Sequence, residues 1–525
     1  MTSSNQAIKQ SGNQKLAIVP VITMFFMFAM ISFVTNMAAP LGNIWKNNYE
    51  WSGMLGNMMN FLAYLIMGIP AGKIMSRIGY KKTALWALGV GFVGMAVQYL
   101  SSLVGTDTAT FSVGGQPVML NFIIYLLGAF ICGFCVCMLN TVVNPMLNLL
   151  GGGGNRGNQL IQTGGTLNSL SGSLTPFLVG ALIGTVTKKT SMTDVAPLLI
   201  IAMGIFALAF IIISIVNIPE PHNSEKADDQ AIKQSDSKKY SAWSFRHLVL
   251  GVIAIFFYVG TEVGIPSELN FYLSNSDASG AGILVNGALI GGAFAAIYWF
   301  CMLIGRFLSS LISGKVSAKV QLTSVASLGI VLVLIAIMIP KSNTISAPGF
   351  IYNPEKATTG ILVDNGMSED AAKAYIANPS SAAIEPYMDD IAQSFNIDKE
   401  IGKDWKDQMT SDKLSSWVMQ KLDASMKVPQ IPLSIIFLIL CGLCTSLMWG
   451  GIFNLSVEGL GKYTEQASGI FMMMVVGGGV MPLIQDFLAG VIGYMASYWL
   501  VVAMLAYILF YALVGSKNVN KDIPV

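Results

Sequence analysis

Long runs of apolar residues recur along the whole chain and restrict its fold more than any other feature. About twenty consecutive apolar residues cross a bilayer as a helix. Because a chain in lipid must satisfy its backbone hydrogen bonds internally, each run predicts a helix. The runs cover about residues 16–40, 53–72, 83–104, 119–146, 158–186, 195–217, 246–273, 284–312, 320–340, 431–455, 467–490 and 493–514. The sequence therefore predicts an all-α integral membrane protein with twelve transmembrane helices.

The composition excludes most other classes of protein. Charged residues make up 11% of the 525 residues and apolar residues 54%, whereas soluble proteins carry about 25% charged residues. A disordered chain would need far fewer apolar residues. The formal net charge of +2 offers no basic surface for a nucleic acid. We therefore expect the lipid bilayer as the main partner of this chain and no nucleic-acid partner.

The distribution of lysine and arginine predicts the orientation in the membrane. One set of loops, together with both termini, carries most of these residues, whereas the short loops on the other side carry only Lys46, Lys188 and Lys189. Basic residues in short loops stay in the cytoplasm. We therefore expect a multi-pass protein of a bacterial-type cytoplasmic (inner) membrane with both termini in the cytoplasm.

Two polar stretches divide the chain. We expect an N-terminal six-helix bundle over 1–217, a cytoplasmic linker over 218–245, and a C-terminal bundle in two parts, 246–340 and 431–525. Between those parts lies a charged insert, 341–430. Ser368 followed by Glu369 and Asp370 is typical of a helix N-cap with an acidic first turn. The insert is therefore predicted to be a small helical unit on the extracytoplasmic face.

The two halves repeat one another. A shift of 306 residues places Asn148 on Asn454 and Arg156 on Lys462, so that two glycine-rich basic turns become equivalent. Two pseudo-symmetric bundles of six helices in parallel repeat resemble the major facilitator superfamily, which implies a substrate site near the midplane between the halves.

The turn between the second and third predicted helices also resembles a signature of that superfamily. Gly72–Lys82 is similar to Gly-x-x-x-Asp-Arg-x-Gly-Arg-Lys, with Ser76 in place of the aspartate. Basic residues at such turns neutralise helix C-termini and pair between the halves in one conformation. The resemblance implies a conformational latch at the helix ends formed by Arg77, Gly79, Lys81, Arg306 and Lys462.

Longer stretches in both halves resemble the branch of fucose, glucose and galactose:proton symporters. These stretches are Asn144-Pro145 through Ser169, Phe257–Glu262, Tyr298–Phe307 and Gly459–Gly469. The resemblance implies a sugar as the substrate. The branch has a carboxylate at the positions of Asn36 and Asn140, and an amide binds sugar hydroxyls but carries no proton. Proton coupling through these two positions is therefore not expected here.

Uncharged polar residues and aromatic rings are the candidates for a sugar site. Sugars require several directional hydrogen bonds and one flat apolar surface. The alternative for each amide is a hydrogen bond between helices, and for each aromatic ring it is core packing. The candidates are Thr35, Asn36, Asn60, Asn140, Asn144, Gln162, Asn168, Tyr258, Trp299 and Asn454, with Tyr298 and Trp449 as further rings.

Acidic residues inside the predicted helices are the candidates for ion coupling, because a charge in the membrane is costly and usually functional. They are Glu262, Glu268 and Asp486. Pro266 is expected to break the helix between the first two and to free backbone carbonyls. Such a site suits Na⁺ near Glu262, whereas a lone carboxylate suits a proton. Asp486 has the alternatives of lining the cavity or pairing with Arg306.

The sequence thus predicts a monomeric secondary transporter that imports a monosaccharide or a close derivative together with Na⁺ or H⁺. Two alternatives stay open. The first alternative is an uncoupled sugar facilitator. The second is a sugar sensor or docking protein that uses the insert. No metal-ligand cluster or nucleophile–base motif supports an enzyme, and no cofactor is expected. Cysteines such as Cys441 and Cys444 lie in apolar runs and are interpreted as packing residues.

Overall fold

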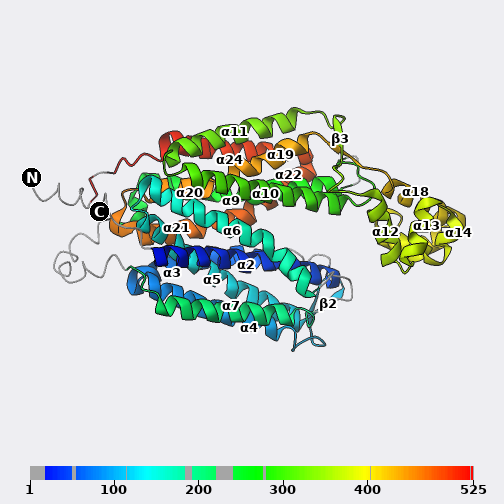
Figure 1. The fold of residues 1–525 in the computed structure, drawn as a ribbon, viewed down its shortest axis with the longest axis horizontal. Coiled ribbons are helices and arrows are strands. Elements are labelled where there is room, and N and C mark those ends of the chain that lie inside the picture. Colours follow the sequence, from blue (N-terminus) through cyan, green and yellow to red (C-terminus); the bar gives the residue numbers. More distant parts are fainter. Residues whose placement is uncertain are drawn as a thin grey trace, which may run out of the picture.

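The computed structural model is a helical bundle with a separate helical unit at one end (Figure 1). It describes residues 18–49, 52, 55–113, 115–183, 192–219, 240–275, 279–395, 397–402, 404–520 and 522–523. Most of the predicted linker, 220–239, lies outside the described residues, so the predicted linker stays a prediction.

The first half of the bundle consists of six long helices. Five follow the predicted apolar runs closely, and a short antiparallel hairpin joins the third helix to the fourth. The helices are α2 (Ile18–Asn48), α3 (Leu55–Ile78), α4 (Tyr80–Leu100), α5 (Leu120–Leu150), α6 (Gly154–Ile183) and α7 (Ala196–Ile215), and the hairpin strands are β1 (Ala109–Val113) and β2 (Gln116–Met119). Gly79 alone separates α3 from α4 and has a φ of 86°, which glycine adopts without strain.

The second half also has six membrane-crossing segments, several of them composite. The first three are single helices, α9 (Arg246–Ser274), α10 (Gly287–Ile312) and α11 (Ala318–Met338), after the short η1 (Ala242–Ser244). The fourth segment combines α19 (Ser434–Thr445) and α20 (Met448–Val457). The fifth combines η3 (Gly461–Tyr463), α21 (Thr464–Met473), η4 (Met474–Val476) and α22 (Gly477–Ile492). The sixth combines α23 (Tyr494–Ser497), α24 (Trp499–Phe510) and the π-helical η5 (Tyr511–Gly515).

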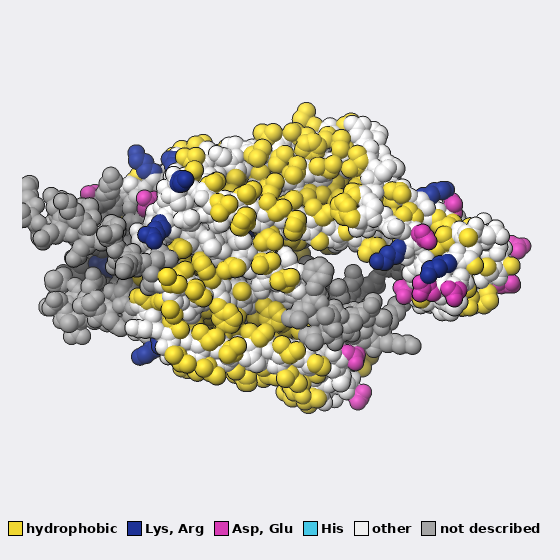
Figure 2. Space-filling model, in the orientation of Figure 1, with side chains coloured by type: hydrophobic (Ala, Val, Ile, Leu, Met, Phe, Trp, Pro, Cys, Tyr) yellow, Lys and Arg dark blue, Asp and Glu magenta, His cyan; other side chains and the backbone are white. Residues whose placement is uncertain are grey.

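The bundle meets the requirements of a membrane protein. Eleven helical segments in the described part are long and apolar enough to cross a bilayer. The twelfth, α6, is 30 residues long but carries many polar side chains. Apolar side chains cover the middle of the bundle, and charged side chains gather toward its two ends (Figure 2). The predicted all-α membrane fold with twelve helices in two bundles is confirmed.

One predicted break in this architecture is wrong. We expected Pro266 to interrupt its helix, but α9 runs without a break from Arg246 to Ser274 with Pro266 inside it. Pro266 lacks the N–H that would bond the carbonyl of Glu262, and membrane helices tolerate such a loss. The hydroxyl of Tyr498 donates to the carbonyl of Ile265 at 3.0 Å.

The insert forms a unit of its own between α11 and α19. Two strands, β3 (Thr344–Ser346) and β4 (Gln430–Pro432), pair as its antiparallel neck. The hydroxyl of Tyr352 donates to the carbonyl of Ser425 at 2.6 Å and accepts from Asn286 at the start of α10. Its other elements are α12 (Pro354–Asp364), α13 (Glu369–Ala377), α14 (Ser381–Ile384), η2 (Glu385–Tyr387), α15 (Met388–Ser394), α16 (Ile397–Glu400), α17 (Trp405–Gln408) and α18 (Ser411–Ser425).

The helical insert is confirmed, and its N-cap is found where the sequence places it. The hydroxyl of Ser368 accepts from the backbone N–H of Ala371 at 3.3 Å. The insert has its own apolar core, which includes Tyr375, Val418 and Leu422. It projects from the bundle end at which α11 ends and α19 begins (Figure 1), which we call the insert end. The end at which α7 ends and α9 begins is called the linker end.

We predict that Leu422→Ala destabilises the insert without unfolding the bundle. Leu422 is fully buried in the core of the insert, and such a truncation costs about 2–5 kcal/mol. Limited proteolysis checks this prediction, because cleavage should become faster within 347–429 only. Val331→Ala, at an exposed position of α11, is the control and should leave the pattern unchanged. Faster cleavage of the bundle helices in Leu422→Ala would contradict the prediction.

Candidate functional site

A cavity of about 690 Å³ lies between the two halves. Its walls come from α2, α3, α5 and α6 of the first half and from α9, α10 and α20 of the second half. The lining combines hydroxyls, amides and aromatic rings with a single ion pair, and a volume of this size accommodates a small molecule.

Five of the predicted polar residues line this cavity, and all of them belong to the first half. They are Thr35, Asn36, Asn140, Gln162 and Asn168. The amide nitrogen of Asn140 donates to the hydroxyl of Tyr64 at 2.6 Å. The amide nitrogen of Asn36 donates to the carbonyl of Ser32 at 2.8 Å, so its oxygen is available to an O–H donor. Asn36 is therefore held by its own helix and Asn140 by the neighbouring α3 while both face the cavity.

Three other predicted amides lie outside the lining. Asn144 is fully buried and accepts from the indole of Trp449 at 3.0 Å, which joins the two halves. Asn454 is buried and donates to the carbonyl of Gly154 at 3.3 Å. Asn60 is buried within the first half. Asn144 and Asn454 thus make contacts between helices, which was the alternative considered from the sequence.

Two tryptophans contribute flat surfaces to the cavity, and two tyrosines lie behind it. Trp299 and Trp449 both line the cavity. Tyr258 is fully buried and its ring meets that of Trp449 edge-on, with centroids 6.3 Å apart. Tyr298 is fully buried as well and shares a hydrogen bond of 2.9 Å with Thr445. The tryptophans therefore offer the apolar ring surface, and the tyrosines support them.

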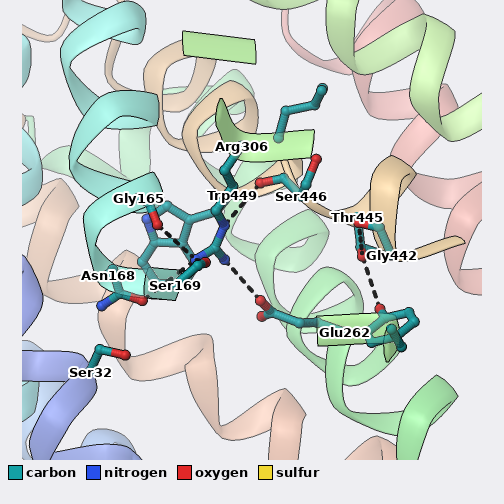
Figure 3. A network of polar contacts seen from close by, with 12 residues as sticks. Ser32, Gly165, Asn168, Ser169, Glu262, Arg306, Gly442, Thr445, Ser446 and Trp449 are labelled. Atoms are coloured by element: carbon teal, nitrogen blue, oxygen red, sulfur yellow. Dashed lines mark hydrogen bonds and ion pairs between the residues drawn. The ribbon is translucent and has the colours of Figure 1, made fainter. Parts of the chain in front are cut away.

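An ion pair between Glu262 and Arg306 crosses one wall of the cavity (Figure 3). The guanidinium lies 3.1 Å from the carboxylate, and the side chains of both residues are only about one-eighth exposed. Both line the cavity. Arg306, predicted as a latch residue, lies six residues before the end of α10 and lines the cavity.

Arg306 also binds the first half of the bundle. Its Nη1 donates to Ser169 Oγ at 2.7 Å, to the carbonyl of Gly165 at 3.3 Å and to Asn168 Oδ1 at 3.5 Å. Its Nε donates to the carbonyl of Ser446 at 3.2 Å. One cation thus connects Glu262 to α6 across the interface between the halves (Figure 3).

This network was missed from the sequence because only acidic residues were sought inside the helices. An arginine in the apolar run 284–312 is as costly in a membrane as a carboxylate. That signal was present in the sequence and would have identified Arg306 as a candidate.

The other two predicted acidic residues lie outside the cavity lining. Glu268 is 1% exposed and Asp486 is exposed on α22. Arg306 pairs with Glu262, so the alternative pairing with Asp486 is not found. Among the described residues, no group of three or more His, Cys, Asp or Glu side chains is placed to hold a metal ion.

The remaining predicted latch residues lie at the linker end. Arg77 is exposed in the last turn of α3. The ammonium of Lys81 donates to the carbonyls of Ser214 at 2.8 Å and Val216 at 2.9 Å, where α7 ends. The ammonium of Lys462 lies 5.4 Å from the ring centre of Tyr463. Lys81 therefore neutralises a helix C-terminus, as expected from the dipole of a helix.

The two halves are held together between the cavity and the linker end. Gln162 donates to the carbonyl of Leu447 at 2.9 Å, and Ser468 donates to the carbonyl of Thr141 at 2.9 Å. Gln159 donates to the carbonyl of Ser310 at 3.1 Å. These hydrogen bonds between the halves lie at the level of Arg306 or nearer the linker end.

Close packing of glycines accompanies these hydrogen bonds. A Cβ added to Gly469 of α21 would lie 2.6 Å from the carbonyl oxygen of Gly68 and 2.8 Å from the Cα of Gly72, both in α3. Small residues allow helix backbones to approach this closely. Among the described residues, contacts between the halves thus close the cavity toward the linker end.

Comparison with known proteins agrees with this architecture. The family model of the Major Facilitator Superfamily matches residues 21–353, which is more than half of the chain. The chain belongs to the major facilitator superfamily. This membership confirms the prediction that the protein is a transporter and not an enzyme.

Individual relatives cover between 64% and 96% of the chain. A glucose/galactose transporter of Brucella abortus is 28% identical over 508 residues, which cover 96% of this chain and 95% of the relative. The L-fucose-proton symporter of Escherichia coli is 22% identical over 364 residues, which cover 64% of this chain and 76% of the relative. The crystal structure of a variant of the E. coli fucose:proton symporter matches with a TM-score of 0.65 at 17% identity and covers 96% of this chain and all of that chain. At this identity the structural match shows the fold.

We predict that Gly469→Val separates the halves at the linker end. The added side chain cannot fit against the backbone of α3, so the conformation closed at this end should lose population. A cysteine introduced as Ser468→Cys, which is buried at the same crossing, should then react several-fold faster with a maleimide. The protein with Ser468→Cys alone gives the reference rate.

The matched control for this experiment is Gly89→Val, because nothing lies within 4 Å of a Cβ at Gly89. It should leave the labelling rate of the introduced cysteine unchanged. Equal labelling rates with and without Gly469→Val would show that the glycine crossing does not control the closure.

Proposed function

We propose that this protein imports a monosaccharide or a close derivative by alternating access, driven by a gradient of Na⁺ or H⁺. The observation that carries the proposal is the cavity between the halves, with amides on one wall and two tryptophans and an ion pair on the other. Amides bind hydroxyls without charge, and an aromatic face accepts the C–H face of a sugar ring. The names of the relatives from B. abortus and E. coli support a sugar as the substrate.

The proposed orientation follows the distribution of basic residues. With the termini and the linker end in the cytoplasm of a bacterial-type inner membrane, the cavity faces outward and is ready to take up its substrate. The insert then lies outside the cytoplasm above the entrance. Import requires the contacts at the linker end, such as Gln162 with Leu447, to open while the halves close at the insert end.

The ion pair of Glu262 with Arg306 is the proposed link between the driving cation and this movement. In the observed state Glu262 neutralises Arg306, while the same guanidinium holds Ser169 and Gly165 of the other half. A proton on Glu262, or a competing cation beside it, removes that neutralisation. Arg306 then requires other acceptors or water, so its bonds to α6 change and the balance between the two conformations shifts.

The transport proposal predicts sugar accumulation in proteoliposomes when a Na⁺ or H⁺ gradient is imposed. Glucose, galactose and fucose are the probes, and uptake of labelled sugar is the measurement. Glu262→Gln should abolish accumulation driven by the gradient but preserve exchange of labelled for unlabelled sugar, because the cavity remains. Accumulation equal to that of the parent protein would remove Glu262 from the mechanism.

The same experiment separates the alternatives. Uptake that is indifferent to both gradients identifies a facilitator. Sugar binding without any uptake or exchange identifies a sensor and refutes the transport proposal.

The binding site itself gives a separate prediction. Asn140→Leu should weaken sugar binding by about tenfold, since one or two hydrogen bonds of about 1 kcal/mol each are lost. Changes in tryptophan fluorescence of the purified protein report the affinity, because Trp299 and Trp449 line the cavity. Gln98→Leu makes a comparable change at a buried position of α4 outside the cavity and should leave the affinity unaltered. An unchanged affinity in Asn140→Leu would exclude this amide from the site.

A further inference from the structure

A second polar site lies in the second half, between α9 and α22 and outside the cavity lining. Thr261, Gly264 and Glu268 are spaced three and four residues apart and therefore share one face of α9. Gly264 places this face against α22, because a Cβ added to it would lie 2.6 Å from Gln485 Oε1. The amide of Gln485 thus lies against α9 at Gly264, one helical turn from Glu268 on the same face.

The polar atoms at this place lack hydrogen-bond partners. Glu268 is 1% exposed and Gln485 is 0% exposed. Glu268 Oε1 and both Gln485 Oε1 and Nε2 are buried without a partner, and so is Thr261 Oγ1 one turn closer to the linker end. Each unsatisfied buried group costs about 1–3 kcal/mol. Three of these four atoms are oxygens, and their grouping on one short stretch of two facing helices points to a ligand that binds oxygen.

The donor set selects the chemistry of that ligand. Carboxylate and amide oxygens are the atoms that hard cations bind. The carboxylate of Glu268 brings one negative charge into the buried space, which a monovalent cation would balance. Asp486, exposed and next to Gln485 in sequence, adds negative potential. A protonated Glu268 would carry no charge and could donate to the oxygen of Gln485, so a proton is the alternative occupant. A monovalent metal ion satisfies both oxygens at once.

We propose that Glu268 Oε1 and Gln485 Oε1 bind a sodium ion between α9 and α22. Glycine at 264 is required by this arrangement, because any larger residue would fill the place that the amide oxygen occupies. Thr261 lies on the same face of α9 as Glu268, nearer the linker end. It directly precedes Glu262, which lines the cavity. Occupation of the site is thereby connected along one helix to the ion pair with Arg306.

This inference deepens the proposed function, on which it rests for its role in transport, because the bound ion would be the driving cation. It selects Na⁺ over H⁺. The binding itself is measurable without any sugar, so that the two proposals are tested separately.

Thermal unfolding of the full-length purified protein in detergent tests the site, with NaCl compared with KCl at equal ionic strength and constant pH. The parent protein should show a saturable rise of its unfolding temperature in NaCl only. Glu268→Gln should require at least tenfold more NaCl for the same rise. Gln485→Leu should lose the rise completely.

Gln485→Leu is expected to fold as well as the parent protein, so a lost response to NaCl reports on the site. Leucine replaces an amide that has no partner, so Gln485→Leu should unfold in KCl at the same temperature as the parent protein or at a higher one. Gln98→Leu makes the same change in α4, where the amide donates to the sulfur of Cys132, and should keep the full response to NaCl. A response lost in both variants overturns the assignment, and so does a response kept in Gln485→Leu.

The results also distinguish the two proposals. A parent protein without a response to NaCl that accumulates sugar on a proton gradient overturns the sodium site and leaves the transport proposal intact. A response to NaCl that requires Gln485, in a protein that neither transports nor exchanges sugar, supports the site and overturns the transport proposal.

Discussion

The guanidinium of Arg306 connects nearly every part of the mechanism that this fold can support. It binds the carboxylate of Glu262 in its own half and Ser169 and the carbonyl of Gly165 in the other half. A charge in a half-buried, low-dielectric space needs acceptors in every conformation. A change at Glu262 is therefore transmitted to the interface between the halves. Arg306 also lines the cavity. The same side chain therefore belongs to the proposed substrate site, to the ion pair and to the interface between the halves.

The closure of the bundle depends on a different kind of contact. At the linker end, glycines 68, 72 and 469 bring the backbones of α3 and α21 into direct contact. Hydrogen bonds from Gln162 and Ser468 to backbone carbonyls complete this interface. These glycine contacts and hydrogen bonds do not themselves involve charged groups, so they are cheap to break and form again. Repeated opening and closing requires an interface of this kind, whereas a strongly hydrophobic interface would hold one state.

The insert obeys the rules of a water-soluble domain although it belongs to a membrane protein. Its helices have N-caps, for example Ser368 and Asn353, and ion pairs such as Lys406 with Asp389 lie on its surface. Its apolar core is separate from that of the bundle. A paired neck of two short strands is the covalent connection, so the insert can be present without disturbing the twelve-helix architecture.

The sequence by itself determined the helices and the insert, because apolar length, charge and capping are local properties. It also identified the amides that line one wall, such as Asn36 and Asn140, through their concentration in one half. It did not determine which side chains reach the cavity. Asn144 and Asn454 bond between helices, Arg306 pairs with Glu262 in the cavity, and Pro266 leaves α9 intact. These outcomes depend on the rotation of each helix and on the neighbours it meets, and packing between distant segments alone decides both.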